Sequence, residues 1–508
     1  MHAFKNIAMQ PIKKTAVVIG AGFSGIGMGI HLKKNGIEDF VILASEDGPG
    51  GTWKVNTYPG AQCDVQSHMY SFSFEPYPYW SRMFGLQDEI LRYQEYCCEK
   101  YGLYPFFSFN TTATKATYQA DTGTWLVETD QGQTYECQFL ISGSGGLSIP
   151  AYPDIKGLHT FKGAKFHSSR WDHSVDLEGK RVAVIGSGAS AIQIVPAIID
   201  EIAHLDYYQR SPSWVLPKPD REITALEQNI FKLFPFAQQM YRAVLYAILE
   251  SRAIGYVVAP QILDLAQQVG VMHVKKYIKD TELRKKMIPN YRMGSKRVLL
   301  SNDYYPAVAN PKTEVISDKI VSIDKTGIKT EDGKHREVDV IVFCTGFHAT
   351  DGVIRYDIIG EGGRNLAEEW KPGPEAYLGI TASGYPNLFL IMGPNTGLGH
   401  NSMIYMIESQ INYIIKSIKY MRKAKIQTID VKPEIQKAFN KKIQKRLEKT
   451  VWTPKVRSWY FTKEGKNTTL WPGFTFEYRA KTSVFKPEDY LTVKVAQIKS
   501  RAPKEAVA

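Results

Sequence analysis

The sequence predicts an α/β protein with two related Rossmann-like dinucleotide-binding domains and a helical insertion in the second domain. Two glycine-rich loops, each between a β-branched run and a segment of helical spacing, carry this prediction. In both halves, an alternating hairpin pattern and an apolar run ending in glycine follow the loop. A chain of 508 residues is too long for one hydrophobic core, so several domains are expected.

The first loop follows the apolar run at residues 15–19 and contains Gly20, Gly22 and Gly25. Glycine at these spacings permits a tight turn, the close approach of a pyrophosphate, and contact between helix and strand. The next segment, residues 26–34, has helical spacing. Its amino terminus would face the phosphates with free N–H groups.

The second loop follows residues 181–185 and contains Gly186, Gly188 and Ser190, with Ala191 as the third small residue. One match to this pattern is weak evidence. Two in one chain, each between a strand and a helix, are strong evidence for two nucleotide sites.

The residue 24 positions after the first glycine identifies the nucleotide, because a carboxylate there binds a ribose hydroxyl and an arginine binds a 2′-phosphate. In the second half this residue is Arg210, and Ser211 beside it adds a donor, so we expect NADPH rather than NADH. In the first half it is Ala44, where a glutamate is usual, and Glu46 is the nearest replacement. FAD is still expected there, because a second backbone approach follows at Gly50, Gly51, Thr52 and Trp53.

These patterns divide the chain into five segments. They are an FAD-binding domain, first part (1–150), an NADPH-binding domain, first part (151–217), a helical insertion (218–292), the second part of the NADPH-binding domain (293–347), and the second part of the FAD-binding domain (348–508), with a mobile loop near 455–472.

The net charge and the cysteine content argue against several kinds of partner and site. A net charge of +12 suits nucleic acid, an acidic membrane surface, or anionic cofactors with a solvated surface. We favour the last, and expect no nucleic-acid partner, because the basic residues are spread along the chain. The five cysteines are odd in number and form no Cys-x-x-Cys pair, so we expect no disulfide, no metal site and a cytoplasmic location.

The most apolar stretch, residues 231–258, contains Arg242, Glu250 and Arg252. These charges argue against a transmembrane span and leave open a weak peripheral contact through an amphipathic helix. The chain is expected to be a monomer or a homodimer.

A segment before the second loop matches the pattern of one enzyme family at Phe161, Gly163, His167, Trp171 and Asp172. With this segment, the chain resembles the type I Baeyer-Villiger monooxygenases, a branch of the class B flavoprotein monooxygenases. Residues 58–64, 294–297, 393–395 and 458–460 match as well, and the resemblance runs from about residue 14 to about residue 490. We expect the segment at 161–172 to be a linker that couples the two domains, with His167 in a structural role rather than as a proton donor.

The resemblance also implies roles for individual residues. Arg297, oriented by Asp64, would lie over the flavin and stabilise an anionic oxygen species, and Lys296 would point to the NADPH phosphate. Trp459 would belong to a loop that closes over the nicotinamide. Gln62 stands where some members have arginine, so that arginine's role does not transfer. The other expected cofactor contacts are Tyr58, Gln193 and Asn395.

The function implied is insertion of one oxygen atom from O₂ next to a ketone carbonyl, using NADPH and a flavin C4a-peroxide, to give an ester or lactone. The substrate would be a small ketone or thioether. The alternative is an N- or S-oxygenating flavin monooxygenase without ketone activity. A pyridine-nucleotide disulfide reductase would need a dithiol beside the flavin, and the sequence supplies none.

Overall fold

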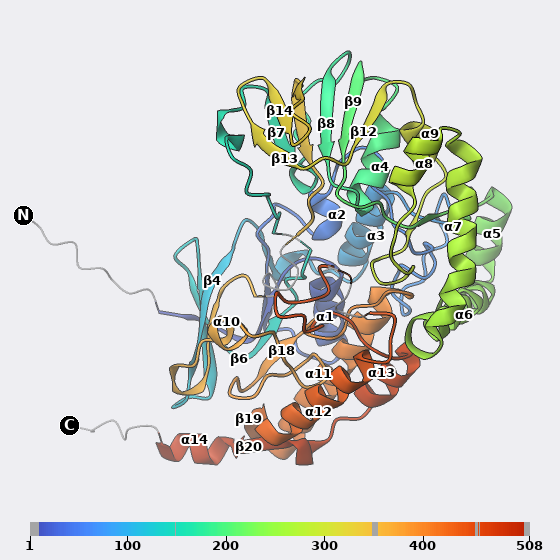
Figure 1. The fold of residues 1–508 in the computed structure, drawn as a ribbon. Helices are drawn as coiled ribbons and strands as arrows, with labels where there is room; N and C mark the ends of the chain where they lie inside the picture. The colour runs from blue at the N-terminus through green and yellow to red at the C-terminus, as the bar shows by residue number, and fades with distance from the viewer. Residues whose placement is uncertain (1–9, 148, 348–353, 453–455, 457, 502–508) are drawn as a thin grey trace, which may run out of the picture.

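The computed structural model describes residues 10–147, 149–347, 354–452, 456 and 458–501. Within these residues two main sheets lie one above the other, with helices between and around them (Figure 1). The ends of the predicted segment 348–508, and residues 455 and 457 of the predicted mobile loop, lie outside the described residues.

The first sheet has eight strands in the order β17-β4-β5-β6-β1-β2-β3, and β18 also pairs with β6. Its central strand β1 is parallel to both β2 and β6, and its carboxyl half is fully buried. β17 and β18 come from the last third of the chain, so the chain returns to this sheet. The bounds are β1 Ile12–Ile19, β2 Phe40–Leu43, β3 Phe107–Ser108, β4 Ala113–Gln119, β5 Thr124–Thr129, β6 Thr134–Ser142, β17 Asp357–Ile359 and β18 Leu388–Leu390.

The second sheet has five parallel strands in the order β12-β9-β8-β16-β7. A three-stranded antiparallel sheet, β13-β14-β15, lies beside it (Figure 1). The two glycine loops thus occupy equivalent places, after β1 and after β8, and the predicted fold class is confirmed. The bounds are β7 Ala164–His167, β8 Arg181–Ile185, β9 His204–Tyr208, β12 Thr313–Ile316, β13 Ile320–Ile323, β14 Gly327–Thr330, β15 His335–Glu337 and β16 Val340–Phe343.

Helices cover both sheets, and a group of them forms the right-hand edge of the molecule in Figure 1. That group comprises α5 (Ala225–Leu233), α6 (Pro235–Ser251), α7 (Leu263–Tyr277) and α8 (Thr281–Met287), with the short turns η4 (Ile254–Val258) and η5 (Pro260–Ile262) between α6 and α7. The other main helices are α1 Phe23–Lys34, α2 Thr52–Val55, α3 Gln87–Lys100, α4 Ala189–Ile198, α9 Tyr304–Val308, α10 Leu366–Glu369, α11 Met403–Ala424, α12 Pro433–Leu447, α13 Thr475–Thr482 and α14 Val495–Arg501.

Two small strand pairs complete the fold. β10 (Val215–Leu216) pairs with β11 (Leu299–Leu300), and β19 (Ile426–Val431) pairs with β20 (Tyr490–Lys494). Among the described residues, no single helix is long and apolar enough to cross a membrane. The bent pair Pro235–Val258 and Pro260–Tyr277, which turns by 112°, passes the same length and composition test only when taken together.

The segment at 161–172 is not simply a linker, and that part of the prediction is wrong. Residues 164–167 form β7, which pairs in parallel with β16 at the edge of the second sheet. The chain crosses between the two sheets elsewhere, where Pro150 forms a bridge with Phe347 and Ala151 N–H donates to Gly346 O at 2.9 Å. A four-residue edge strand containing Lys165 and His167 has too weak an apolar pattern to be recognised from sequence.

Candidate functional site

The first glycine loop has the geometry of a nucleotide-binding turn. Gly20 has φ +99°, and a Cβ on Gly25 would lie 1.8 Å from Gly20 O, so only glycine permits this contact of helix and strand. Gly22 is the N-cap of α1, where no side chain caps the helix and no acidic residue occupies the first turn. The free N–H groups at this helix end can bind an anionic pyrophosphate.

A second glycine segment lies directly against this loop. A Cβ on Gly51 would lie 2.8 Å from the Cα of Gly22, and Gly50 N–H donates to Ala21 O at 2.9 Å. Thr52 and Trp53 follow at the start of α2, and the Trp53 indole donates to Tyr70 OH at 3.1 Å. The first nucleotide site is therefore enclosed by two stretches of backbone.

The position after β2 has no acidic side chain. Ala44 is buried, and its backbone is held by Ser108 and Thr111. Glu46 is half-buried and lies 3.8 Å from Arg170, which comes from the segment after β7. The structure thus places a carboxylate close to the expected position and gives it a partner from the second domain.

The second glycine loop has the same backbone but more open surroundings. Gly186 has φ +123°, and a Cβ there would lie 2.2 Å from Cys344 O. Gly188 is the N-cap of α4, and a Cβ built on it would meet nothing within 4 Å. Ser190 lies in the first turn of α4, so the open helix end can receive the phosphates of a second nucleotide.

Cationic side chains gather beyond the end of β9. Lys296 Nζ donates to Ser211 Oγ at 2.9 Å and lies 4.6 Å from the centre of the Tyr291 ring. Burial, and after it the charge of Arg210, lowers the pKa of Lys296. Arg210 is exposed and has no ion-pair partner among the described residues. Two cations and a hydroxyl group held this close together suit a phosphate ester.

Next to this cationic group in sequence, Arg297 forms an ion pair with Asp64. Arg297 Nε and Nη2 donate to the two carboxylate oxygens of Asp64 at 2.8 and 2.7 Å. Burial alone would raise the pKa of Asp64, but the charge and hydrogen bonds of Arg297 outweigh it and hold that pKa below its usual value. The charge of Asp64 in turn raises the pKa of Arg297. Both groups therefore stay ionised.

Three further residues surround this pair, of which Tyr460 belongs to the matching segment 458–460 and the other two were not expected from the sequence. Lys218 is buried and donates from Nζ to Gln62 Oε1 at 2.6 Å, and burial lowers its pKa. Tyr256 and Tyr460 are buried, and burial raises the pKa of each phenol, while Arg297 opposes the shift. Lys218 lies 156 residues from its partner Gln62, and no local pattern in the sequence indicates this contact.

A chain of hydrogen bonds joins α4 to the segment that precedes Asp64. Tyr58 OH donates to Gln193 Oε1 at 2.8 Å, and Gln193 Nε2 donates to Gln62 O at 2.9 Å. A Cβ on Gly60 would lie 2.6 Å from Gln193 O, so glycine permits the contact between this segment and the helix. Tyr58 and Gln193, both expected to bind a cofactor, here tie the two nucleotide sites to each other.

His167 is fully buried and fixes the return of the chain to the first sheet. Its Nδ1 accepts from Ser169 N–H at 3.1 Å, so its Nε2 carries the proton that is donated to Gly346 O at 3.0 Å. Burial lowers the pKa of His167 to about 4, so the ring is neutral at neutral pH. The geometry fits a structural role.

The remaining motif residues have structural surroundings. Phe161 is buried, and a Cβ on Gly163 would lie 2.2 Å from Asp339 O. Trp171 meets the Phe166 ring edge to face at 4.9 Å, and Asp172 accepts from Ser174 N–H at 3.0 Å.

The segment that contains Trp459 lies next to the Arg297–Asp64 pair, whose charges act on Tyr460. Trp459 is 44% exposed, and its ring contacts that of Tyr460 at 4.6 Å. Asn395 is buried and donates from its amide to Asn467 O and Leu470 O at 3.0 and 3.1 Å. The side chain of Asn395 therefore holds this part of the chain in place.

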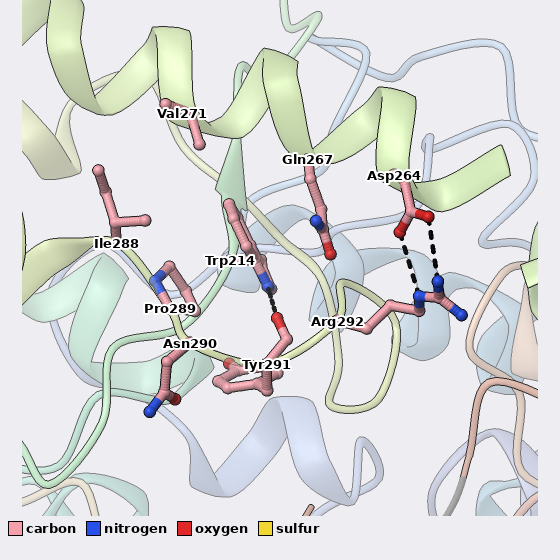
Figure 2. A pocket seen from close by; sticks show the side chains of 9 residues that line it. All are labelled: Trp214, Asp264, Gln267, Val271, Ile288, Pro289, Asn290, Tyr291 and Arg292. Carbon is pink, nitrogen blue, oxygen red and sulfur yellow. Dashed lines mark hydrogen bonds and ion pairs between the residues drawn. The ribbon is translucent and has the colours of Figure 1, made fainter. Parts of the chain in front are cut away.

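A cavity of about 440 Å³ lies between α7 and the segment that contains Pro289, Tyr291 and Arg292 (Figure 2). The Trp214 indole donates to Tyr291 O at 2.8 Å across it, and Asp264 pairs with Arg292 at its edge. Tyr291 is the lining residue nearest to the cationic group, because Lys296 Nζ lies 4.6 Å from the centre of its ring.

One side-chain group among the described residues has metal-ligand spacing, formed by His204, Asp206 and Glu314. Arg336 donates to Glu314 at 2.8 Å and supplies a positive charge there. The group lies on β9 and β12, and no observation indicates an ion.

Comparisons with known proteins agree with this geometry. Residues 17–238 match the profile of the pyridine nucleotide-disulphide oxidoreductase family. The chain is 48% identical to a Baeyer-Villiger monooxygenase of Pseudomonas aeruginosa over 96% of its length and 94% of that protein's. It is 43% identical to one of Streptomyces coelicolor over 92% and 90%.

Solved structures match over nearly the whole chain. A closed crystal structure of cyclohexanone monooxygenase aligns with a TM-score of 0.86 and 28% identity, covering 95% of this chain and 100% of that one. A steroid monooxygenase bound to NADP aligns with a TM-score of 0.85 and 27% identity, covering 95% and 100%. With two glycine loops, a bidentate Arg297–Asp64 pair and relatives of this identity and coverage, the chain belongs to the Baeyer-Villiger monooxygenases.

Proposed function

We propose that this protein is an FAD-containing, NADPH-dependent monooxygenase that inserts one atom of O₂ next to a ketone carbonyl. The observation that carries this proposal is the Arg297–Asp64 pair, in which two hydrogen bonds join the residue next to Lys296 to the segment that Gln193 of α4 also contacts. The side chains of Arg297 and Asp64 are 34% and 25% exposed, so a ligand can reach a charge that is otherwise enclosed.

The residues present fit both cofactors. The enclosed loop at Gly22 and Gly51 would hold the FAD pyrophosphate, and the open end of α4 would hold that of NADPH. Arg210, Ser211 and Lys296 would bind the 2′-phosphate. FAD, reduced by NADPH, supplies the activation of dioxygen when both are bound.

Arg297 would stabilise the negative charge that develops on oxygen during addition to the carbonyl. A guanidinium stays charged at any working pH, and its attraction for an anion is strongest where water is excluded. Asp64 orients the guanidinium through two hydrogen bonds and limits the net charge of the site. Lys218 provides a second cation beside Asp64, so the pair sits in a positive field.

The enzyme would work on a small ketone in a reducing compartment such as the cytoplasm. The supporting observation is that all five cysteines are free and buried. Burial raises the pKa of Cys63, the cysteine next to Asp64, to about 12, so this thiol is protonated and unreactive.

The test is aerobic turnover of the holoenzyme with NADPH and a panel of linear, cyclic and aryl ketones and thioethers, with products identified by mass. We expect esters or lactones. Arg297→Ala should keep flavin reduction by NADPH and lose ester formation by about a hundredfold or more. Arg297→Lys serves as the matched control that keeps the charge and loses the bidentate geometry.

Two outcomes would contradict the proposal. Oxygenated thioethers or amines without any ester would favour the N- or S-oxygenating alternative. Unchanged ester yield in Arg297→Ala would remove this residue from the mechanism.

A further inference from the structure

The outer face of the helical group α5–α7 exposes large apolar side chains. More than half of the exposed large apolar residues of the described chain lie between residues 226 and 272. Soluble monomers rarely expose contiguous apolar areas of this kind, and such an area usually marks a contact with a partner or a membrane. These helices form one edge of the molecule, away from both sheets (Figure 1).

The exposed side chains follow the helical repeat. On α6, Phe236, Met240, Val244 and Ile248 recur every four residues and are 72%, 52%, 52% and 48% exposed. The opposite face of α6 is buried at Leu245 and Leu249. A helix that packs on the protein through one face normally carries polar residues on the opposite face. A second apolar face therefore indicates that something covers it.

α7 repeats the arrangement. Leu265, Val269 and Met272 are 74%, 42% and 61% exposed, while Val274 on the other side is buried. On α5, Leu233 is 71% exposed. The three helices lie along one edge of the molecule, and we call the surface formed by their exposed apolar side chains the insertion face.

The charges around the insertion face are positive. The acidic residues of α5–α7 are neutralised, because Glu227 pairs with Arg221, Asp264 pairs with Arg292, and Glu250 is buried against Thr475. Four exposed cations have no ion-pair partner among the described residues, namely Lys232, Arg252, Lys275 and Lys276.

We propose that the insertion face binds the surface of an anionic lipid bilayer. Apolar side chains would enter the headgroup region, and the four cations would meet lipid phosphates. The charge pattern selects lipid over a second copy of this chain. Two copies would bring like-charged rims together, whereas an anionic surface attracts a chain of net charge +12. The proposal does not depend on the reaction that the enzyme catalyses.

The turn η4 connects this face to the catalytic pair. Ile254 and Val258 are 41% and 62% exposed, while Tyr256 between them is buried and feels the charges of Arg297 and Asp64. In a protein docked on a membrane, one side of η4 would contact lipid, and the other side would face the Arg297–Asp64 pair. If the proposed function is right, apolar ketones dissolved in the bilayer would lie close to the site.

Vesicle sedimentation of the holoenzyme tests the docking. We expect binding to vesicles of phosphatidylcholine with phosphatidylglycerol, and much less to phosphatidylcholine alone or at high salt. The double variant Val244→Asp with Val269→Asp should lower the partition coefficient by about tenfold or more. The matched control is Val321→Asp with Val484→Asp, which changes the charge equally at valines of similar exposure outside the insertion face.

Flavin content and thermal midpoint show that each variant is folded. Equal partition of the two double variants, or binding that is indifferent to lipid charge, would overturn the proposal. A wild-type dimer that binds no vesicles and becomes monomeric only in the insertion-face variant would also overturn it, in favour of self-association. Loss of vesicle binding with unchanged ketone turnover would leave the proposed function intact.

Discussion

The two glycine loops have nearly the same backbone and different surroundings. Gly22 and Gly188, each the N-cap of its helix, have φ/ψ of −84°/−165° and −85°/−167°. In front of Gly22 lies the Cα of Gly51, 3.6 Å from a Cβ placed there, whereas nothing lies within 4 Å of one on Gly188. The same turn is covered by backbone in one domain and open in the other.

We expect this difference to distinguish a nucleotide that stays bound from one that exchanges during turnover. An enclosed site binds through many backbone contacts and releases its ligand slowly, whereas an open one depends on a few charged side chains at its far end. The first site has Ala44 where a carboxylate is usual, and a second backbone segment lies against its glycine turn. The second has two cations and a hydroxyl group at Arg210, Ser211 and Lys296.

One added methyl group at each nucleotide site should affect the two sites differently. Gly51 has φ +53°, and a Cβ there would lie 2.8 Å from Gly22 Cα, so Gly51→Ala should displace the covering segment and yield protein without bound flavin. Gly188→Ala should keep the fold and the flavin, because its Cβ enters open space, and should weaken NADPH binding. Flavin absorbance per protein and the NADPH KM are the measurements. Full flavin content in Gly51→Ala would show that enclosure does not hold the first nucleotide.

A second test concerns the cations of the open site. Lys296→Met and Arg210→Ala should each raise the KM for NADPH by about 10- to 100-fold, because each removes a charge-assisted contact to the 2′-phosphate. NADH oxidation should change little, since NADH lacks that phosphate. Lys279→Met, at an exposed lysine between α7 and α8, is the control. A parallel loss with both nucleotides would mean that these residues act on the fold rather than on the phosphate.

Features that depend on local patterns could be predicted from the sequence. Each glycine loop lies between a strand and a helix within about 20 residues, so Gly20 and Gly186 could be assigned from spacing alone. The Arg297–Asp64 pair came from the family resemblance, since its members are 233 residues apart. Lys218 and Tyr256 were missed because only the folded chain brings them to that pair.

The error at residues 161–172 has a physical cause as well. The segment lies between two glycine loops in sequence, which favoured a linker, but β7 gains its stability from hydrogen bonds to β16, about 175 residues later. Non-local strand pairing leaves little trace in a four-residue segment. The segment contains His167, and the contribution of this residue to the stability of the fold can be measured.

The smallest expected effect concerns His167, which is bonded to Gly346 at the point where the chain leaves the second sheet. Its pKa of about 4 in the folded protein lies below 6.5 in the unfolded chain, so the unfolded state takes up a proton first as pH falls. The stability that the neutral ring contributes is therefore complete above pH 6.5 and declines toward pH 4. At pH 5 the loss is ~2 kcal/mol, which is about 2 °C in thermal midpoint for a chain of this length. His167→Gln should lower the thermal midpoint more at pH 7.5 than at pH 5, because the neutral ring contributes its full stability only at the higher pH. The other buried histidines remain in both proteins and cancel. Equal shifts at the two pH values would mean that folding does not lower the pKa of His167, and burial would then not be what keeps its ring neutral between Ser169 and Gly346.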